Sequence, residues 1–239
     1  MSTNPTSNQP SKPCPYRIWL AGLGALCSFV VVLTWLPLVF GFDFERLNAV
    51  LLERFGPARV FMLEKWQRVL LAALPLTESE KLIKINDFFN NNFLFIDDME
   101  VWGQADYWAT PLELIGQGRG DCEDMAIAKY YSLKETGVAV EKLRLVYVRA
   151  RTNGPKGASV QAHMVLAYYP TPTAEPLVLD NLDLEIKPAS QRSDLQPIFS
   201  FNSDAIWSGV AANATRNEGS GQLTRWQDLQ LRAVKEGLL

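Results

Sequence analysis

The 239-residue sequence has one histidine and three cysteines, and it has no stripe of basic residues. Its formal net charge is −3, from 23 lysines and arginines against 26 aspartates and glutamates. Proteins that bind nucleic acid gather their basic residues on one face, often among exposed aromatic residues. Because the basic residues are scattered here, we exclude nucleic acid as a partner.

The cysteines are too few and too far apart for a disulfide framework. Cys14 lies in a polar N-terminal tail and Cys27 in an apolar run, which leaves Cys122 alone in the remainder of the chain. In an oxidising compartment a lone thiol is a liability unless it is deeply buried or chemically needed. Cys122 is therefore the first candidate for a functional residue.

The N-terminal region predicts a membrane-targeting element. Residues 1–17 are polar and include Lys12 and Arg17, and residues 18–42 contain no charged residue. This run is longer than the apolar part of a cleaved signal peptide and long enough to span a bilayer, so we interpret it as a signal anchor, with a signal peptide as the alternative. Since the positive charges precede the run, residues 43–239 are expected in the periplasm of a Gram-negative cell, held at the inner membrane if the anchor is retained.

Hydrophobic periodicity in residues 43–239 predicts helices first and strands later. Such an order is typical of an α+β fold with an antiparallel sheet. We expect the segment 97–120 to be irregular. The predicted helices lie between Pro57 and Pro75, between Thr77 and Asn92 with a capping box from Thr77 and Glu80, from about Asp121 to Gly137, and over 223–238. The predicted strands are 142–150, 162–169, 176–182 and, less regularly, 197–202.

Cys122 stands in the stretch GRGDCEDMAIAKYYSL, at the start of a predicted helix. The first turn of a helix lowers the pKa of a thiol because free backbone N–H groups and the helix dipole favour negative charge. Gly118 and Gly120 would let the chain approach the helix start closely and leave the sulfur accessible. The alternative is an inert, buried cysteine.

A thiol nucleophile needs a base that takes its proton and an acid that protonates the leaving group, and one imidazole can do both. His163 is the only histidine and lies near the start of a predicted strand, where Val165 and Ala167 would share its face. A third group usually orients the imidazole. Asp180, at the end of the next apolar strand, is the candidate, and Asn181 and Asp183 are its competitors. The alternatives are a structural histidine and an exposed turn residue.

The stretches DYWATPLELIGQGRGDCEDMAIAKYYSL, LRLVYV, AHMVLAYY and LVLDNL resemble the bacterial transglutaminase-like cysteine proteinases of the LapG type, over roughly residues 53–201. The resemblance implies a papain-like and transglutaminase-like fold, in which the helix that bears the nucleophile packs on an antiparallel sheet. It also implies a cysteine endopeptidase with Cys122 as nucleophile, His163 as general base and acid, and Asp180 as orienting carboxylate.

The resemblance further implies a periplasmic enzyme that depends on Ca²⁺ and cleaves a large surface adhesin near its N-terminus, which promotes biofilm dispersal. A cyclic-di-GMP-sensing receptor in the inner membrane would restrain it. The family pattern assigns calcium to Asp121, Glu123 and Asp124. Carboxylates beside a thiol raise its pKa, and a bound cation would offset them. The alternative is that they only complement the helix dipole.

Several alternatives stay open at this point. Asp97, Asp98 and Asp106 are further candidate calcium ligands. The backbone N–H of Cys122 is the first candidate for an oxyanion donor, and the indole of Trp108 is a second. The same triad could transfer an acyl group to an amine, as transglutaminases do, and a non-enzymatic binding module would need no reactive thiol.

Overall fold

The computed structural model describes residues 41–154, 157–210, 215–218 and 223–238, all within the compact unit Val39–Leu239. The expected tail over 1–17 and nearly all of the expected anchor over 18–42 lie outside these residues. Within the described ranges, no helix is both long enough and apolar enough to cross a membrane.

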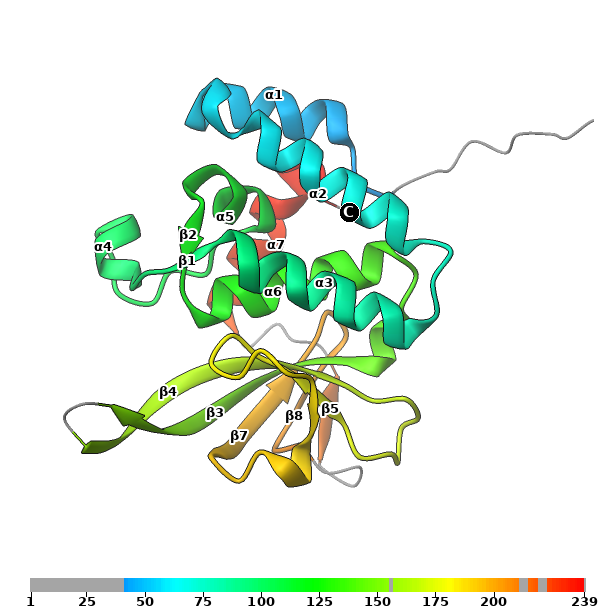
Figure 1. Cartoon of the computed structure of the whole chain (residues 1–239), viewed down its shortest axis with the longest axis vertical. Coiled ribbons are helices and arrows are strands. Elements are labelled where there is room, and N and C mark those ends of the chain that lie inside the picture. Colours follow the sequence, from blue (N-terminus) through cyan, green and yellow to red (C-terminus); the bar gives the residue numbers. More distant parts are fainter. Residues whose placement is uncertain (1–40, 155–156, 211–214, 219–222, 239) are drawn as a thin grey trace, which may run out of the picture. The chain divides into compact units, whose positions relative to one another are not determined.

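Helices cover one face of a sheet (Figure 1). α6 packs against β3 and β4 of the sheet, and α1 and α2 lie farther from it. Short 3₁₀ turns at Pro57–Arg59, Val140–Lys142 and Ala189–Gln191 connect some of the elements. The helices are α1 (Phe44–Phe55), α2 (Val60–Ala73), α3 (Glu78–Asn92), α4 (Asp98–Trp102), α5 (Pro111–Gln117), α6 (Cys122–Glu135) and α7 (Thr224–Glu236).

The main sheet has the strand order β6-β5-β4-β3-β7-β8-β9, and all its pairs are antiparallel. A separate parallel pair, β1 with β2, joins the end of α3 to the segment that leads into α6. The strands are β1 (Leu94–Phe95), β2 (Arg119–Gly120), β3 (Leu143–Gly154), β4 (Gly157–Tyr168), β5 (Leu177–Leu179), β6 (Lys187–Pro188), β7 (Leu195–Phe201), β8 (Ala205–Trp207) and β9 (Arg216–Glu218).

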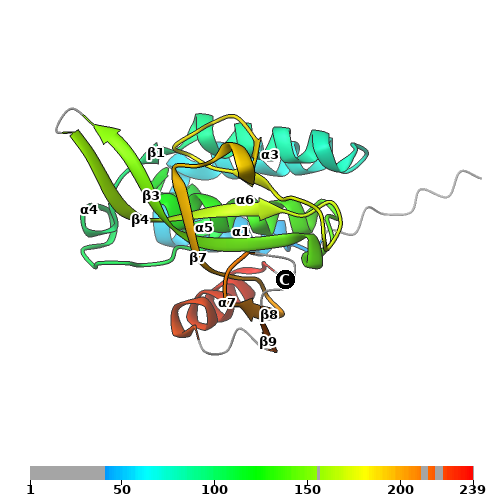
Figure 2. The same ribbon diagram turned by 90° about the horizontal axis from the view of Figure 1, so that it is seen from below.

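The hairpin of β3 and β4 extends beyond the rest of the sheet (Figure 2). Val148 of β3 is paired with His163 of β4. β5 is paired with β4 only at Leu166–Tyr168, so among the described residues the segment 157–165 has no strand partner on that edge. In both views α4 lies on the same side of the unit as the hairpin.

The two faces of the sheet carry two apolar clusters. Met164 and Leu166 of β4 are buried against the helices, whereas Val165 and Ala167 belong to a smaller cluster on the opposite face. This confirms the alternation predicted for the strand that bears the histidine. Among the helices, Trp66 of α2 is fully buried, and a large apolar side chain of this kind contributes about 1.5–3 kcal/mol by burial.

The predicted order of helices followed by an antiparallel sheet is confirmed, as is the capping box of Thr77 and Glu80. The expectation that 97–120 is irregular is wrong, because α4 and α5 lie there. α5 begins with a second capping box, from Thr110 and Glu113, and with Pro111 in its first turn. Its seven residues are too few to show helical periodicity, and its capping pattern was the signal that could have predicted it.

Candidate active site

Cys122 is the first residue of α6. The chain reaches this helix through Gly118, which ends α5 in the left-handed conformation at φ +69°, and through Gly120. A Cβ atom at Gly120 would lie 2.5 Å from Oδ2 of Asp124. Gly120 is therefore needed so that the Asp124 carboxylate can pack against the entry to the helix.

The Cys122 side chain is 9% exposed and donates a hydrogen bond to Oε2 of Glu123, at 2.9 Å. A backbone hydrogen bond from Met164, the residue after His163, also reaches the sulfur. Burial and then the charges of Glu123 and Asp121 raise the pKa of the Cys122 thiol well above its usual value. The helix start alone therefore does not make the sulfur a thiolate in this arrangement.

His163 and Asp180 form the second part of the site. Nε2 of His163 lies 2.7 Å from Oδ1 of Asp180, and each residue is 2% exposed. With Nε2 held by the carboxylate, Nδ1 is the ring nitrogen left for a reacting group. Among the described residues it is Asp180, not its competitors, that binds the imidazole, since Asp183 pairs with Lys187 at 2.8 Å.

Asp180 is held by several donors besides the imidazole. The backbone N–H groups of Asn181 and Leu182 donate to Oδ1, at 2.6 and 3.1 Å, and Nη2 of Arg192 donates to Oδ2 at 2.6 Å. Burial by itself raises the pKa of Asp180, but His163 and Arg192 outweigh it and lower that pKa to about 2. Arg192 was not predicted, because its stretch, ASQRSD, has no regular pattern.

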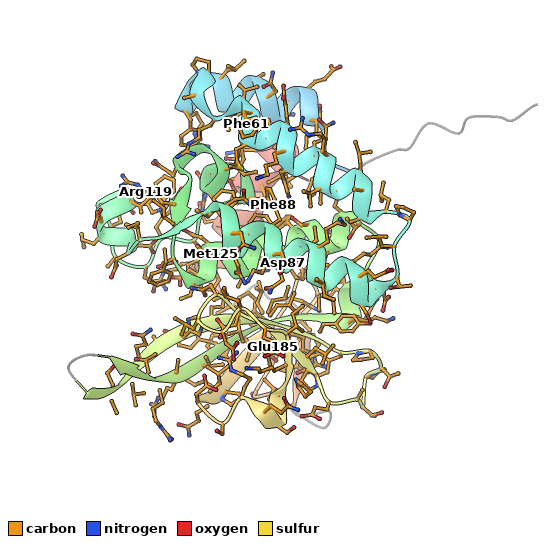
Figure 3. The ribbon with its side chains drawn as sticks, viewed as in Figure 1. Phe61, Asp87, Phe88, Arg119, Met125 and Glu185 are labelled. Carbon is orange, nitrogen blue, oxygen red and sulfur yellow. The ribbon has the colours of Figure 1, made fainter. Side chains whose placement is uncertain are left out.

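Cys122 and His163 line one cavity of about 430 Å³. Figure 3 labels Arg119 and Met125, which lie three residues before and three residues after Cys122 in the sequence and so show where the cysteine lies. Most of the remaining wall is acidic or polar, with two aromatic side chains. The other lining residues are Phe95, Asp97, Asp98, Asp106, Asp121, Glu123, Tyr147, Gln161 and Ala162.

The carboxylates of Asp98, Asp121 and Asp124 converge beside the cavity, each with an oxygen within 4.8 Å of the others. One buried oxygen of each has no hydrogen-bond partner: Oδ1 of Asp98, Oδ1 of Asp121 and Oδ2 of Asp124. Mainly through burial, and further through their neighbouring carboxylates, the pKa of Asp98 rises to about 7, that of Asp121 to about 10, and that of Asp124 well above its usual value.

This cluster fits a hard cation. None of the ion pairs among the described residues involves these three carboxylates, and Ca²⁺ takes several oxygen ligands of this kind. Asp121 and Glu123 also lie with the Cys122 sulfur in a second such group. The predicted Asp121 thus belongs to both groups, Asp124 to the first and Glu123 to the second.

Of the three further candidate ligands, the structure adds Asp98 to the cluster. Asp106 is engaged elsewhere, because it pairs with Arg225 at 2.9 Å and accepts a hydrogen bond from Nε1 of Trp108 at 3.0 Å. Asp97 lines the cavity but is exposed. Since Trp108 is buried and its N–H is already used, its expected role as an oxyanion donor is not supported.

Comparison with known proteins agrees with this geometry. The sequence model of the bacterial transglutaminase-like cysteine proteinase family (BTLCP) matches residues 67–196. A comparison with curated proteins gave no significant match.

Solved structures of a Legionella pneumophila protein, LapG, are similar over most of the chain. The EGTA-treated form is 33% identical, with a TM-score of 0.67, covering 81% of this chain and 99% of that one. The calcium-bound form is 36% identical, with a TM-score of 0.65, covering 80% of this chain and 98% of that one. Both likenesses support a mixed helix and antiparallel-sheet fold, and the residues matched by the family model, 67–196, include the cysteine, the histidine and the acidic cluster.

Proposed function

The chain belongs to the bacterial transglutaminase-like cysteine proteinases, and from that membership we propose that it is a thiol endopeptidase with Cys122 as nucleophile, His163 as general base and acid, and Asp180 as orienting carboxylate. A single observation carries the proposal: Cys122 and His163 line the same cavity, while Asp180 binds Nε2 of the imidazole.

The proposed reaction follows from these positions. Nδ1 of His163 takes the thiol proton, and the sulfur attacks the carbonyl carbon of the scissile peptide bond. The C–N bond breaks as the imidazolium returns the proton to the leaving amine, which leaves a thioester on Cys122. Water then attacks the thioester with His163 as base, which releases the new carboxyl end and the thiol.

The surroundings of the triad suit this sequence of steps. Asp180 stays ionised throughout, since its pKa is about 2, and it stabilises the imidazolium. The backbone N–H of Cys122, at the start of α6, is placed to donate to the oxyanion. Glu123 accepts a hydrogen bond from the thiol and has to release it before His163 can take the proton.

We further propose that Ca²⁺ is held by Asp98, Asp121 and Asp124 together with Glu123. The unpartnered buried oxygens and the absence of a cationic partner among the described residues support this, as do the two Legionella structures, described as calcium-bound and EGTA-treated. When bound, the ion supplies positive charge that offsets the carboxylates beside the thiol. Without such a charge, Glu123 and Asp121 oppose ionisation of Cys122.

The resemblance also supports a place and a substrate. We propose that the enzyme acts in the periplasm on a large surface adhesin, that it is restrained by a cyclic-di-GMP-sensing receptor of the inner membrane, and that residues 18–42 carry or hold it there. The uncharged run after Lys12 and Arg17 supports the location.

The test is incubation of the full chain with a cell-surface extract rich in large adhesins, with calcium and with EGTA. We expect one discrete cut, which requires calcium and disappears in Cys122→Ala and in His163→Ala while both variants stay folded by circular dichroism. Cleavage by Cys122→Ala would refute the thiol mechanism, and equal cleavage in EGTA would refute the calcium requirement. Mass spectrometry separates two shortened products from a crosslinked one, which would instead indicate acyl transfer.

A further inference from the structure

One helix contacts both of the strands that carry the partners of Cys122. Cys122 begins α6 and receives a hydrogen bond from Met164, next to His163 on β4. Lys129 lies seven residues farther, which is close to two helical turns, or about 10 Å along the axis. The two side chains therefore project from the same face of α6, and Lys129 reaches the end of β5 at Asp180.

Lys129 is buried to an extent that is unusual for a lysine. It is 1% exposed, and Nζ donates to the backbone carbonyl oxygen of Asp180 at 3.1 Å. Burial lowers the pKa of Lys129 to about 7, although the charges of Asp180 and Asp87 act in the opposite direction. Asp87 lies on α3, above the sheet (Figure 3). Burying an amine is costly unless it is hydrogen-bonded or paired, so the bond to the Asp180 carbonyl oxygen offsets part of this cost.

The carbonyl to which Lys129 donates lies directly after the end of a strand. β5 ends at Leu179, so Asp180 is the first residue beyond the strand ladder. Its backbone oxygen accepts a second hydrogen bond, from Nδ2 of Asn90 at 2.8 Å. Because the direction of a side chain follows its backbone, two donors on this carbonyl fix where the Asp180 carboxylate points. That carboxylate is the partner of Nε2 of His163.

We propose that Lys129 is a positioning residue, which fixes the Asp180 carboxylate against His163 by holding the Asp180 carbonyl. Asn90 contributes to the same hold. α6 thus sets the position of the nucleophile at its first residue and that of the orienting carboxylate two turns later. The inference rests on the triad proposed above, but its test does not depend on cleavage of any substrate.

The experiment uses the fact that the chain has only one histidine. NMR titration of the imidazole in EGTA follows His163 without overlap, in the unaltered chain and in Lys129→Met. The matched control is Lys81→Met. Lys81 is also a buried lysine that donates to a backbone carbonyl, that of Thr136 at 2.7 Å, but at the other end of α6.

The sign of the change distinguishes the possible roles of Lys129. If Lys129 positions Asp180, its loss weakens the bond that stabilises the imidazolium, and the titration midpoint of His163 falls by about 0.5–1 pH unit. If Lys129 acts only as a nearby positive charge, its removal raises the midpoint. We expect a fall in Lys129→Met and no change in Lys81→Met, and a raised or unchanged midpoint in Lys129→Met would overturn the inference.

Should Lys129→Met fail to fold, Asn90→Ala decides, because it removes the other donor to the same carbonyl. A lowered midpoint there supports the hold on Asp180, and an unchanged one refutes it. Failure of the proposed function looks different: no cut of an adhesin would be seen in the unaltered chain, whatever the midpoints are.

Discussion

Asp180 and Asp124 are both buried carboxylates next to residues that line the same cavity, yet their pKa values are displaced in opposite directions. Asp180 faces Arg192 and His163 and accepts two backbone N–H bonds. Asp124 faces Asp98 and Glu123, and one of its oxygens has no partner. Burial penalises the charge of both groups, so the partners decide the direction.

The two carboxylates differ in what can balance their negative charge. On the histidine side the chain supplies its own cation, Arg192, and the charge of Asp180 is settled by folding. On the other side the chain brings carboxylate oxygens together without a cationic side chain among the described residues. If the proposed Ca²⁺ binds there, the charge of that side depends on the ion, whereas the charge of Asp180 does not.

The largest effect is expected when Asp180, whose charge is balanced by Arg192, is replaced. Asp180→Ala leaves the buried His163 without its carboxylate and Arg192 with Asp194 alone, and we expect cleavage to fall about 10³- to 10⁴-fold and the free energy of unfolding to fall by about 3–5 kcal/mol. Asp183→Ala is the control, because Asp183 is bound to Lys187 and not to the imidazole. Rates on the adhesin substrate and urea unfolding measure both. Equal losses in the two variants would contradict the assignment.

Glu236 is an intermediate case between Asp180 and Asp124, because its cation, Arg54, also pairs with Glu113. Nη1 of Arg54 binds Glu236 at 2.6 Å, while Nη2 binds Glu113 at 2.6 Å. Burial and then the charge of Glu113 raise the pKa of Glu236 to about 7, against the effect of Thr110 and Arg54. The ion pair with the shared Arg54 is therefore not enough to offset the burial of Glu236.

A raised carboxyl pKa means that the folded chain binds a proton that the unfolded chain has lost. Stability should therefore fall as the pH rises from about 4.5 to about 7, by up to about 3 kcal/mol from Glu236. Urea unfolding at several pH values should show this slope reduced in Glu236→Gln but not in the exposed Glu141→Gln. A slope that is unchanged in Glu236→Gln would show that Glu236 is not its source.

The smallest effect, but the one with the most distinctive sign, is expected at Asp124→Asn. In EGTA the buried Asp124 carboxyl has to take up a proton on folding, which costs stability near neutral pH, and the neutral amide avoids this cost, so the melting temperature should rise by about 2–5 °C. In calcium the substitution removes a ligand and should lower the melting temperature. The hydrogen bond from the N–H of Ala109 can be kept by the amide oxygen. Asp183→Asn should show no such reversal, and a shift of the same sign in both buffers would count against a metal at this site.

Local sequence patterns predicted the elements that position Cys122, His163 and Asp180. The strand bearing His163 was predicted because its alternation of apolar residues continues over two buried faces, Met164 and Leu166 against Val165 and Ala167. The start of α6 was predictable because glycine and acidic residues precede an apolar helix. Asp180 was favoured because it follows the next apolar strand, and the structure places it on the imidazole.

Contacts between distant segments could not be predicted in this way. Nothing in the sequence distinguishes Asp98 from Asp97 as the neighbour of Asp124, because the choice depends on how α4 is turned toward α6. Arg192 lies in a stretch without periodicity. Lys129 left a faint signal, a single lysine in the otherwise apolar stretch MAIAKYYSL, where α6 is buried on nearly every side.

The spacing of Cys122 and Lys129 on α6 also limits how this segment can change during evolution. One inserted residue between them would rotate the two side chains about 100° apart around the axis, and one deleted residue would do the same in the opposite sense. This part of the helix can therefore exchange residue types but keeps its length. Past Glu135, where the helix ends, an added residue would leave the phase of the nucleophile untouched.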